Sequence, residues 1–111
     1  MQTAKMQASP IPEVDQKGYL REPETWTTKV AEALAQEEVP DGLTDAHWKI
    51  IVYMRHYFLD IGTVPPLRKM SGETGFTLRE MKKLFPSGLA NSACKIAGIP
   101  SEAIKPSFLY P

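Results

Sequence analysis

A chain of 111 residues is long enough for one domain with a real core, and 42% hydrophobic with 23% charged residues is ordinary for a soluble globular protein. Lys plus Arg and Asp plus Glu number 13 each, and this zero net charge argues against a dedicated nucleic-acid binder. A single cysteine excludes a disulfide framework within these residues, and no apolar run is long enough for a membrane span or a secretory signal, so we expect a cytoplasmic protein.

The first predicted elements are a flexible N-terminus and a small hairpin. Residues 1–12 are polar and contain Pro10 and Pro12, which predicts a flexible end. Residues 13–20, EVDQKGYL, contain a turn signal between two short extended pieces. We therefore predict a short β-hairpin there.

Two longer helices are predicted next. The first covers residues 23–38, because a proline suits a first helical turn and apolar residues recur at helical spacing after it. The second covers residues 45–61, with Thr44 as its N-cap and Gly62 as its end. This second helix is apolar on most of its surface, which predicts that it is the central helix of the core.

Two shorter helices are predicted after these. Two consecutive prolines begin one that runs through Met70, and Gly72 and Gly75 bracket the loop that follows it. Thr77 and Glu80 match the capping box of the other, which ends before the next proline.

The stretch from Leu84 to Pro100, LFPSGLANSACKIAGIP, places Cys94 in a fifth predicted helix. Ser87 is its expected N-cap, and Gly98 is its stop signal. The apolar residues that form its buried stripe are Leu89, Ala93, Ile96 and Ala97. Cys94 falls about a quarter-turn off that stripe, at roughly 100° per residue, so the spacing predicts a thiol within reach of solvent.

The residues alone leave two interpretations of Cys94 open. It is either a reactive thiol on a shoulder of small residues, or a small, partly buried hydrophobe without reactivity. Its place about two turns into the helix gives a thiolate little help from the helix dipole. Nucleophilic catalysis by a Cys–His pair would need a histidine beside it, and nothing in the sequence shows that the fold provides one.

The sequence predicts no metal or cofactor. His47 and His56 are nine residues apart, on opposite sides of one predicted helix. No CxxC or HxxxH spacing, glycine-rich phosphate loop or GxSxG motif is present. The resemblance described below implies that the chain is at most a component of a transfer system and not a stand-alone enzyme.

Positive charge gathers in the C-terminal half. Residues 64–111 carry a net charge of +4, and residues 1–63 carry −4. The basic residues on the two shorter helices are Arg68, Lys69, Arg79, Lys82 and Lys83. They form a docking face for an acidic partner, or the phosphate contacts of a helix-turn-helix that binds DNA, or merely solvated charge. The zero net charge weighs against DNA.

Several segments together resemble the DsrC/TusE family of sulfur-relay proteins, which includes the gamma subunit associated with dissimilatory sulfite reductase. LFPSGLANSACKIAG is similar to the hallmark segment of that family. LTDAHWKII, Val64-Pro65-Pro66 and TGFTLREMKKLFPSG fall in the family's order and spacing. The resemblance runs through almost the whole chain.

The resemblance implies a small α+β protein that is mainly helical, with about five helices, a short N-terminal β-hairpin and a C-terminal arm. Residues 13–100 would form the single domain and residues 101–111 the arm. The family members are sulfur carriers, in which an arm cysteine takes persulfide sulfur from a donor and presents it to an acceptor. Cys94 looks like the second, helix-borne cysteine of the sulfite-reductase type. The implied partners are sulfur-relay or sulfite-reductase proteins.

The chain departs from the family at the arm. Lys105 stands where the resemblance places the arm cysteine. We therefore expect neither the two-cysteine cycle nor transfer through the arm. Two hypotheses remain: Cys94 itself accepts sulfur, or transfer is lost and the chain is a non-catalytic regulator or scaffold on sulfur-relay partners. The intact ACKIAG helix favours the first, and the apolar tail SFLYP favours the second.

Overall fold

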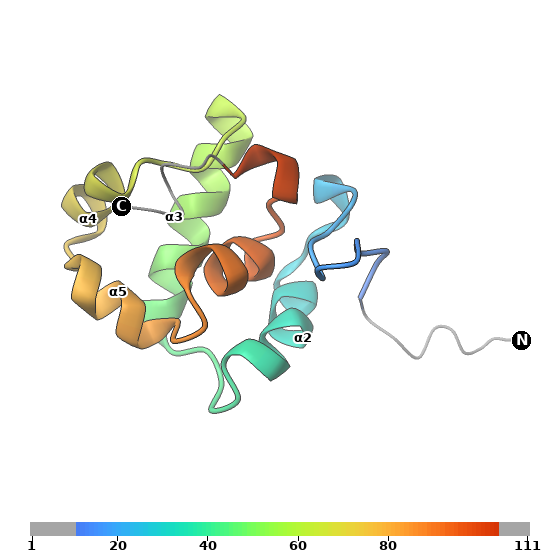
Figure 1. Ribbon diagram of the computed structural model, residues 1–111, viewed down its shortest axis with the longest axis horizontal. Helices are drawn as coiled ribbons and strands as arrows, with labels where there is room; N and C mark the ends of the chain where they lie inside the picture. The colour runs from blue at the N-terminus through green and yellow to red at the C-terminus, as the bar shows by residue number, and fades with distance from the viewer. Residues whose placement is uncertain (1–10, 105–111) are drawn as a thin grey trace, which may run out of the picture.

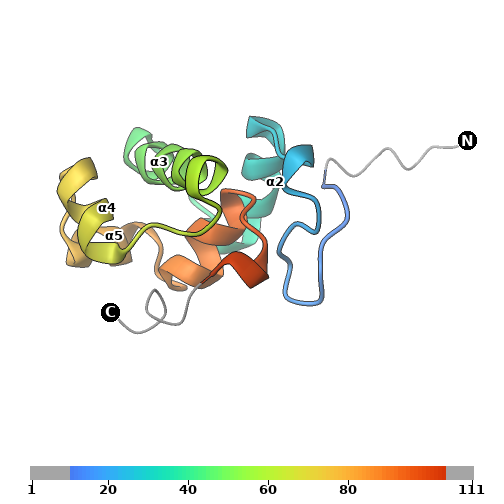
Figure 2. The same ribbon diagram turned by 90° about the horizontal axis from the view of Figure 1, so that it is seen from above.

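Seven helical elements follow one another in the described part of the chain, residues 11–104 of the computed structural model. They are η1 (Pro23–Thr25), α2 (Thr28–Glu38), α3 (Asp45–Ile61), α4 (Leu67–Thr74), α5 (Leu78–Leu84), η2 (Leu89–Cys94) and η3 (Ser101–Ala103). Figure 1 shows η2 in the middle of the molecule, between the α4–α5 pair on one side and α2 on the other. Figure 2 shows α3 running across one face of this arrangement.

The predicted β-hairpin is wrong. Between residues 11 and 104, the extended structure is limited to one isolated antiparallel bridge, between Val14 and Leu20. The turn signal itself is correct, because the Gly18 N–H donates to the Asp15 carbonyl at 3.0 Å. One bridge beside a turn is too little pairing for a sheet. The described fold is therefore mainly helical, and the predicted α+β class is corrected in this respect.

The first long helix starts later than the sequence predicts. The chain makes a single 3₁₀ turn at η1 and then turns extended at Trp26, so α2 begins only at Thr28. Thr27 caps it by accepting a hydrogen bond from the Val30 N–H at 3.1 Å. The break frees the Trp26 indole N–H to donate to the carbonyl of Ile96 at 2.7 Å. A long-range hydrogen bond thus replaces one turn of local helix.

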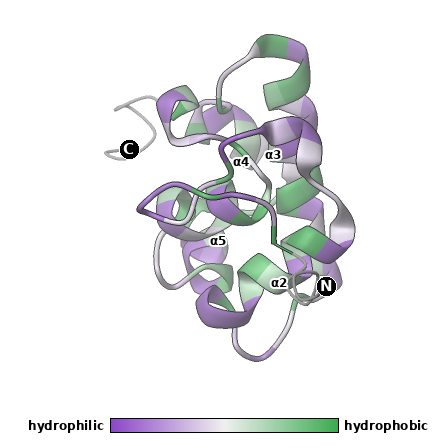
Figure 3. Cartoon of the chain, turned by 90° about the vertical axis from the view of Figure 1, so that its right-hand side faces the viewer, coloured by the Kyte–Doolittle hydropathy of each residue, from purple (hydrophilic) through white to green (hydrophobic). Residues whose placement is uncertain are grey.

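The bounds of α3 are as predicted, but it is buried over less of its surface than the sequence predicts. Thr44 caps it in a box with His47, and Gly62 ends it in the left-handed conformation. Ile50 and Ile51 are fully buried, while Leu59 and Ile61 at the other end are 58% and 61% exposed. Figure 3 shows this end of α3, at the top of the view, with hydrophobic segments beside hydrophilic ones. α3 packs against α4, α5 and η2, so its central place in the fold is as predicted, but only one side of it is buried.

The helix α4 continues past its predicted end at Met70. It includes Gly72 and ends at Thr74, followed by Gly75 with φ +83°. The Thr74 hydroxyl donates to the Met70 carbonyl at 2.7 Å and supports this last turn. The capping box predicted for the next helix is confirmed, since Thr77 and Glu80 each satisfy the other's backbone N–H at the start of α5.

The predicted ends of the chain are outside the part that the structure describes. The flexible N-terminus, residues 1–12, is described only at residues 11 and 12. The predicted arm, residues 101–111, is described only as far as Ile104, with Ala103 and Ile104 partly buried against the core. The domain limits at 13 and 100 therefore stay a prediction. In the described range, no helix is both long and apolar enough to cross a membrane.

Gly98 is the position where the fold tolerates a side chain least. A Cβ there would lie 2.4 Å from Cδ1 of Trp26, and the backbone has φ +73°. Gly62 has a similar φ of +96°, but its surroundings are open. We expect Gly62→Ala to cost about 1 kcal/mol for the left-handed backbone alone. Gly98→Ala should cost about 3 kcal/mol or more, because the clash is added.

Urea unfolding of the two variants beside the wild type measures both costs. Equal losses of unfolding free energy in the two variants would contradict the close approach of Trp26 to Gly98.

Candidate functional site

The helix that carries Cys94 is enclosed on nearly every side. Along residues 89–97, only Asn91 is exposed and Lys95 is half-buried. Cys94 is free and 0% exposed, so the predicted shoulder within reach of solvent is wrong for this structure. The helix is a π-helix, wider than the geometry assumed for the predicted stripe. A stripe drawn at α-helical spacing therefore misplaces the thiol.

The expected Ser87 cap is also absent. Gly88 occupies the N-cap position with φ +105°, and η2 has no side-chain cap. Instead, the Asn91 side-chain amide donates back to the Ser87 carbonyl at 3.3 Å. A glycine at this corner lets the chain turn sharply from α5 into the enclosed helix.

Burial controls the chemistry of the thiol. It raises the pKa of Cys94 well above the ordinary value, because the thiolate would be removed from water without compensation. The nearest basic side chain along the helix, Lys95, is already paired with Glu38 at 3.3 Å. In this structure Cys94 is therefore a neutral thiol and not an activated nucleophile.

A polar cluster lies along one side of the Cys94 helix. Glu38, the last residue of α2, accepts from Lys95 at 3.3 Å and from the Ser92 hydroxyl at 3.5 Å. The Glu38 and Lys95 side chains are both only 16% exposed, and Ser92 is fully buried. This half-buried ion pair joins η2 to α2, and it gives the buried hydroxyl of Ser92 its partner.

Tyr19 covers the same side of the helix from the N-terminal segment. Its hydroxyl donates to the Ala90 carbonyl at 2.6 Å, and the Lys95 ammonium lies 5.5 Å from its ring centre. Burial, helped by the nearby Cys94 thiol and by Asp15, raises the pKa of Tyr19 to about 12. The phenol therefore stays a neutral donor at physiological pH.

The end of the helix is held by an arginine and a tryptophan. Arg55 donates to the carbonyls of Ala97 and Pro23, at 3.1 and 2.8 Å. Its guanidinium also lies 4.5 Å from the centre of the Trp26 ring. Sequence reasoning missed Arg55, Tyr19 and Glu38. For Arg55 a signal existed, because a lone arginine in an otherwise apolar helical stretch needs buried acceptors.

Neither histidine reaches Cys94 by a hydrogen bond in the structure. Nδ1 of His47 accepts from the Thr44 N–H at 3.0 Å, so Nε2 carries the proton and donates to the Leu84 carbonyl at 2.8 Å. His56 is exposed on α3. Among the described residues, no group of three or more side chains is arranged to hold a metal ion.

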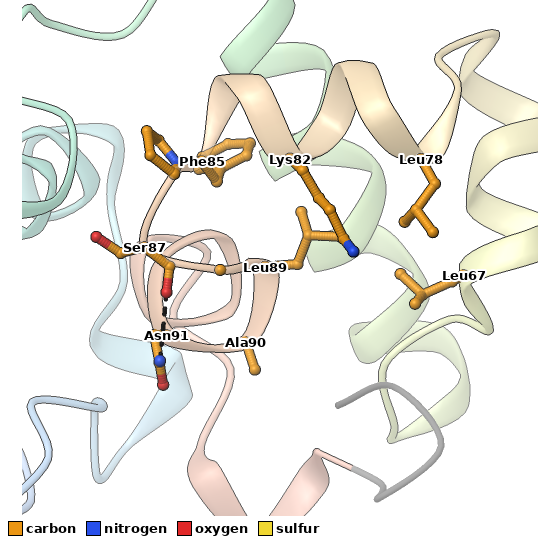
Figure 4. A pocket seen from close by; sticks show the side chains of 10 residues that line it. Leu67, Leu78, Lys82, Phe85, Ser87, Leu89, Ala90 and Asn91 are labelled. Carbon is orange, nitrogen blue, oxygen red and sulfur yellow. Dashed lines mark hydrogen bonds between the residues drawn. The ribbon is translucent and has the colours of Figure 1, made fainter. Parts of the chain in front are cut away.

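The predicted basic residues separate into two sets. Arg79, Lys82 and Lys83 line one shallow hollow on α5, together with Leu78. Lys82 also borders a neighbouring cavity of about 370 Å³ between α4, α5 and η2. Figure 4 shows Leu67, Leu78 and Leu89 converging on this cavity with the Lys82 side chain among them. Arg68 and Lys69 are exposed on α4 but line neither hollow.

The fold and site thus define a class: a small helical protein built around an enclosed helix with a single buried cysteine. Comparison with known proteins makes this specific. The family model described as DsrC like protein matches residues 7–104. The chain belongs to the DsrC-like family, which confirms the resemblance to DsrC/TusE proteins.

Two relatives and one solved structure show how close the similarity is. The chain is 38% identical over 88 residues to the dissimilatory-type sulfite reductase subunit gamma of Nitratidesulfovibrio vulgaris, covering 79% of this chain and 84% of that one. It is 36% identical over 99 residues to the sulfurtransferase TusE homolog of Haemophilus influenzae, covering 82% and 89%. The crystal structure of the oxidized gamma-subunit of the dissimilatory sulfite reductase (DsrC) from Archaeoglobus fulgidus is 41% identical, with a TM-score of 0.73 over 79% of this chain and 86% of that one. Nothing in these comparisons supports DNA binding.

The burial of Cys94 predicts a particular dependence of stability on pH. Its folded-state pKa is raised above an unfolded value of about 8.5, so the unfolded state loses the thiol proton first as pH rises. The stability is complete below about pH 8.5 and falls above it. Between pH 8 and pH 10, the wild type should lose about 2 kcal/mol that Cys94→Ala does not lose.

Urea unfolding of both proteins at the two pH values measures this difference. Identical pH dependence in wild type and Cys94→Ala would show that the thiol ionises as easily in the folded chain as in the unfolded one.

Proposed function

We propose that this chain is a sulfur-relay component of sulfur metabolism, in which Cys94 is the group that accepts and passes on sulfur. The proposal is carried by one observation: the cysteine lies in η2, inside the region that matches the DsrC-like family model. The relatives named as a sulfite reductase gamma subunit and as a sulfurtransferase support this class of function. The other thiol-bearing position expected from the family holds Lys105.

The transfer needs no external oxidant or reductant. The Cys94 thiolate attacks the outer sulfur of a donor persulfide, forming a new S–S bond while the donor's S–S bond breaks and the donor thiolate leaves. An acceptor thiolate then attacks the outer sulfur on Cys94, and the Cys94 thiolate leaves. One sulfur atom moves at each step. Both steps require a thiolate that the partner can reach.

Because the Cys94 thiol is buried, the proposed relay depends on a change of conformation. In the enclosed helix, Cys94 is neutral and out of contact with solvent. Transfer therefore requires a conformation in which the thiol is exposed. If no such conformation is reached, the chain keeps the fold and the docking surface without the chemistry, which is the regulator or scaffold hypothesis.

The basic residues of α5 supply a surface for a partner. Arg79, Lys82 and Lys83 line an open hollow that adjoins the apolar cavity of Leu67, Leu78 and Leu89. A partner with acidic side chains around an apolar anchor would match this combination of charge and apolar area. We propose that sulfur-relay or sulfite-reductase proteins dock here, with Arg68 and Lys69 extending the charge along α4.

Intact mass spectrometry tests the relay at Cys94. Reduced wild-type protein and Cys94→Ala are treated with a small-molecule persulfide donor under native conditions and, in parallel, in denaturant. We expect the native wild type to gain the mass of sulfur and Cys94→Ala to gain none. Recovery of the original mass after a thiol acceptor is added would complete the cycle.

The denatured samples give this experiment its control. If the wild type gains sulfur only when unfolded, even with the docking partners present, then Cys94 is not a carrier. The regulator or scaffold function would replace the relay in that case.

Charge reversal tests the docking face. The triple variant R79E/K82E/K83E should bind a sulfite-reductase or sulfur-relay partner at least about tenfold more weakly, and wild-type binding should fall as salt rises. Lys29→Glu, an exposed position on α2, is the matched control and should bind as the wild type does. Binding measured in a salt series checks both. Unchanged binding of the triple variant would place the partner elsewhere.

A further inference from the structure

A short N-terminal strap, residues 13–21, passes over the Cys94 helix. Its turn is closed by the Asp15 carboxylate, which accepts from the backbone N–H groups of Lys17 and Tyr19 at 2.9 and 3.0 Å. Partial desolvation works to raise the pKa of Asp15, but these hydrogen bonds and one from Ser101 outweigh it and lower the pKa. In Figure 3 the strap crosses in front of the body of the molecule.

The strap is attached to the body by a few specific contacts. The Tyr19 hydroxyl donates to Ala90, one turn before Cys94 on η2. The Ser101 hydroxyl donates to the second carboxylate oxygen of Asp15 at 3.1 Å. The Lys95 side chain runs beneath the turn, since a Cβ on Gly18 would lie 3.4 Å from it. The strap thus covers the residues that flank Cys94.

Tyr19 and Leu20 are buried, but the strap as a whole is held by fewer backbone hydrogen bonds than the helices around it. Its own backbone pairing consists of the Val14–Leu20 bridge and three hydrogen bonds, from the N–H groups of Asp15, Gly18 and Arg21. Its Glu13–Arg21 ion pair, at 3.6 Å, lies between exposed side chains. Exposed ion pairs of this kind contribute little. By contrast, α2 and α3 are continuous helices of 11 and 17 residues. Segments with few buried contacts and few backbone hydrogen bonds open locally at a lower free-energy cost than the whole fold.

We propose that the strap is a hinged cover, and that its local opening is the route by which Cys94 becomes accessible without unfolding of the protein. The proposal rests on the proposed function, because it gives the buried thiol a way to meet a donor. Leu20, which is almost fully buried, anchors the C-terminal end of the strap. The moving part is therefore the turn from Asp15 to Tyr19.

Opening changes the chemistry of Cys94 as well as its access. When the strap opens, the Tyr19 side chain moves away from Ala90, and water can then reach the Cys94 side of η2. The desolvation that raises the pKa of Cys94 is then relieved, so a thiolate forms more readily. One movement therefore makes the Cys94 thiol accessible and also favours its ionisation. A closed strap correspondingly protects the thiol from unselective oxidation.

The rate of alkylation of Cys94 by N-ethylmaleimide under native conditions measures this opening. Asp15→Ala removes the side-chain hydrogen bonds of the turn but leaves its backbone bonds, and Tyr19→Phe removes the bond to Ala90. Each should speed alkylation by about 3- to 10-fold, the effect of one lost hydrogen bond on an opening equilibrium. Asp15→Asn keeps an acceptor oxygen at the same place and should stay within about twofold of wild type.

Thr77→Ala is the matched control. It removes the N-cap of α5, which lies on the other side of the molecule from the strap (Figure 1), and it lowers global stability by a similar amount. If Cys94 is reached through the strap, Thr77→Ala leaves the alkylation rate unchanged. If it is reached by global unfolding, Thr77→Ala speeds alkylation as much as the strap variants do.

Equal acceleration in the control, or no acceleration in the strap variants, would overturn the proposal. The dependence on urea gives a second readout: strap opening exposes little surface, so the rate should hardly change at low urea, whereas global unfolding makes it rise steeply. Alkylation reports access alone. Failure of the relay would instead appear as an alkylated wild type that takes up no sulfur from a persulfide donor.

Discussion

The fold depends on the near-complete enclosure of one short helix, η2. η2 has no side-chain cap, and residues 96–100 after it are buried in the middle of the molecule, where unpaired carbonyls are costly. Tyr19, Trp26 and Arg55 solve this problem by donating to carbonyls along the helix and just after it. These three donors come from three different segments. Each segment is therefore fixed against the same helix, and the surrounding architecture follows from that requirement.

This constraint also explains which features the sequence could predict. The bounds of α3 and the capping box of α5 are set by residues within one or two turns of each other, and both predictions are confirmed. The helix that carries Cys94 is instead held by Tyr19 and Glu38, which bond to Ala90 and Ser92 from more than fifty residues away. The break at Trp26 has the same origin, because the indole bonds to Ile96. Local patterns do not carry such information.

The other differences between prediction and structure lie at single residues whose local effect is small. Gly72 was expected to end α4, yet glycine costs only about 1 kcal/mol inside a helix, and the helix continues to Thr74. The turn signal near Gly18 was correct, but a turn does not provide the several paired residues that a hairpin needs. The exposed end of α3 could not be foreseen from its composition, since it depends on how far the neighbouring elements extend.

The enclosure gives the single cysteine a property that an exposed cysteine would lack. Reactivity and exposure are coupled, because the same low-dielectric surroundings that hide the thiol also suppress its ionisation. A carrier with an exposed thiol discriminates between partners only by how well each partner docks beside the thiol. If Cys94 carries sulfur through the proposed opening of the strap, a partner must also stabilise the open state, and a partner that binds this state more tightly shifts the population toward it. Selectivity among partners would then depend on how far each partner offsets the free-energy cost of opening. The basic residues of α5 would supply binding energy for this.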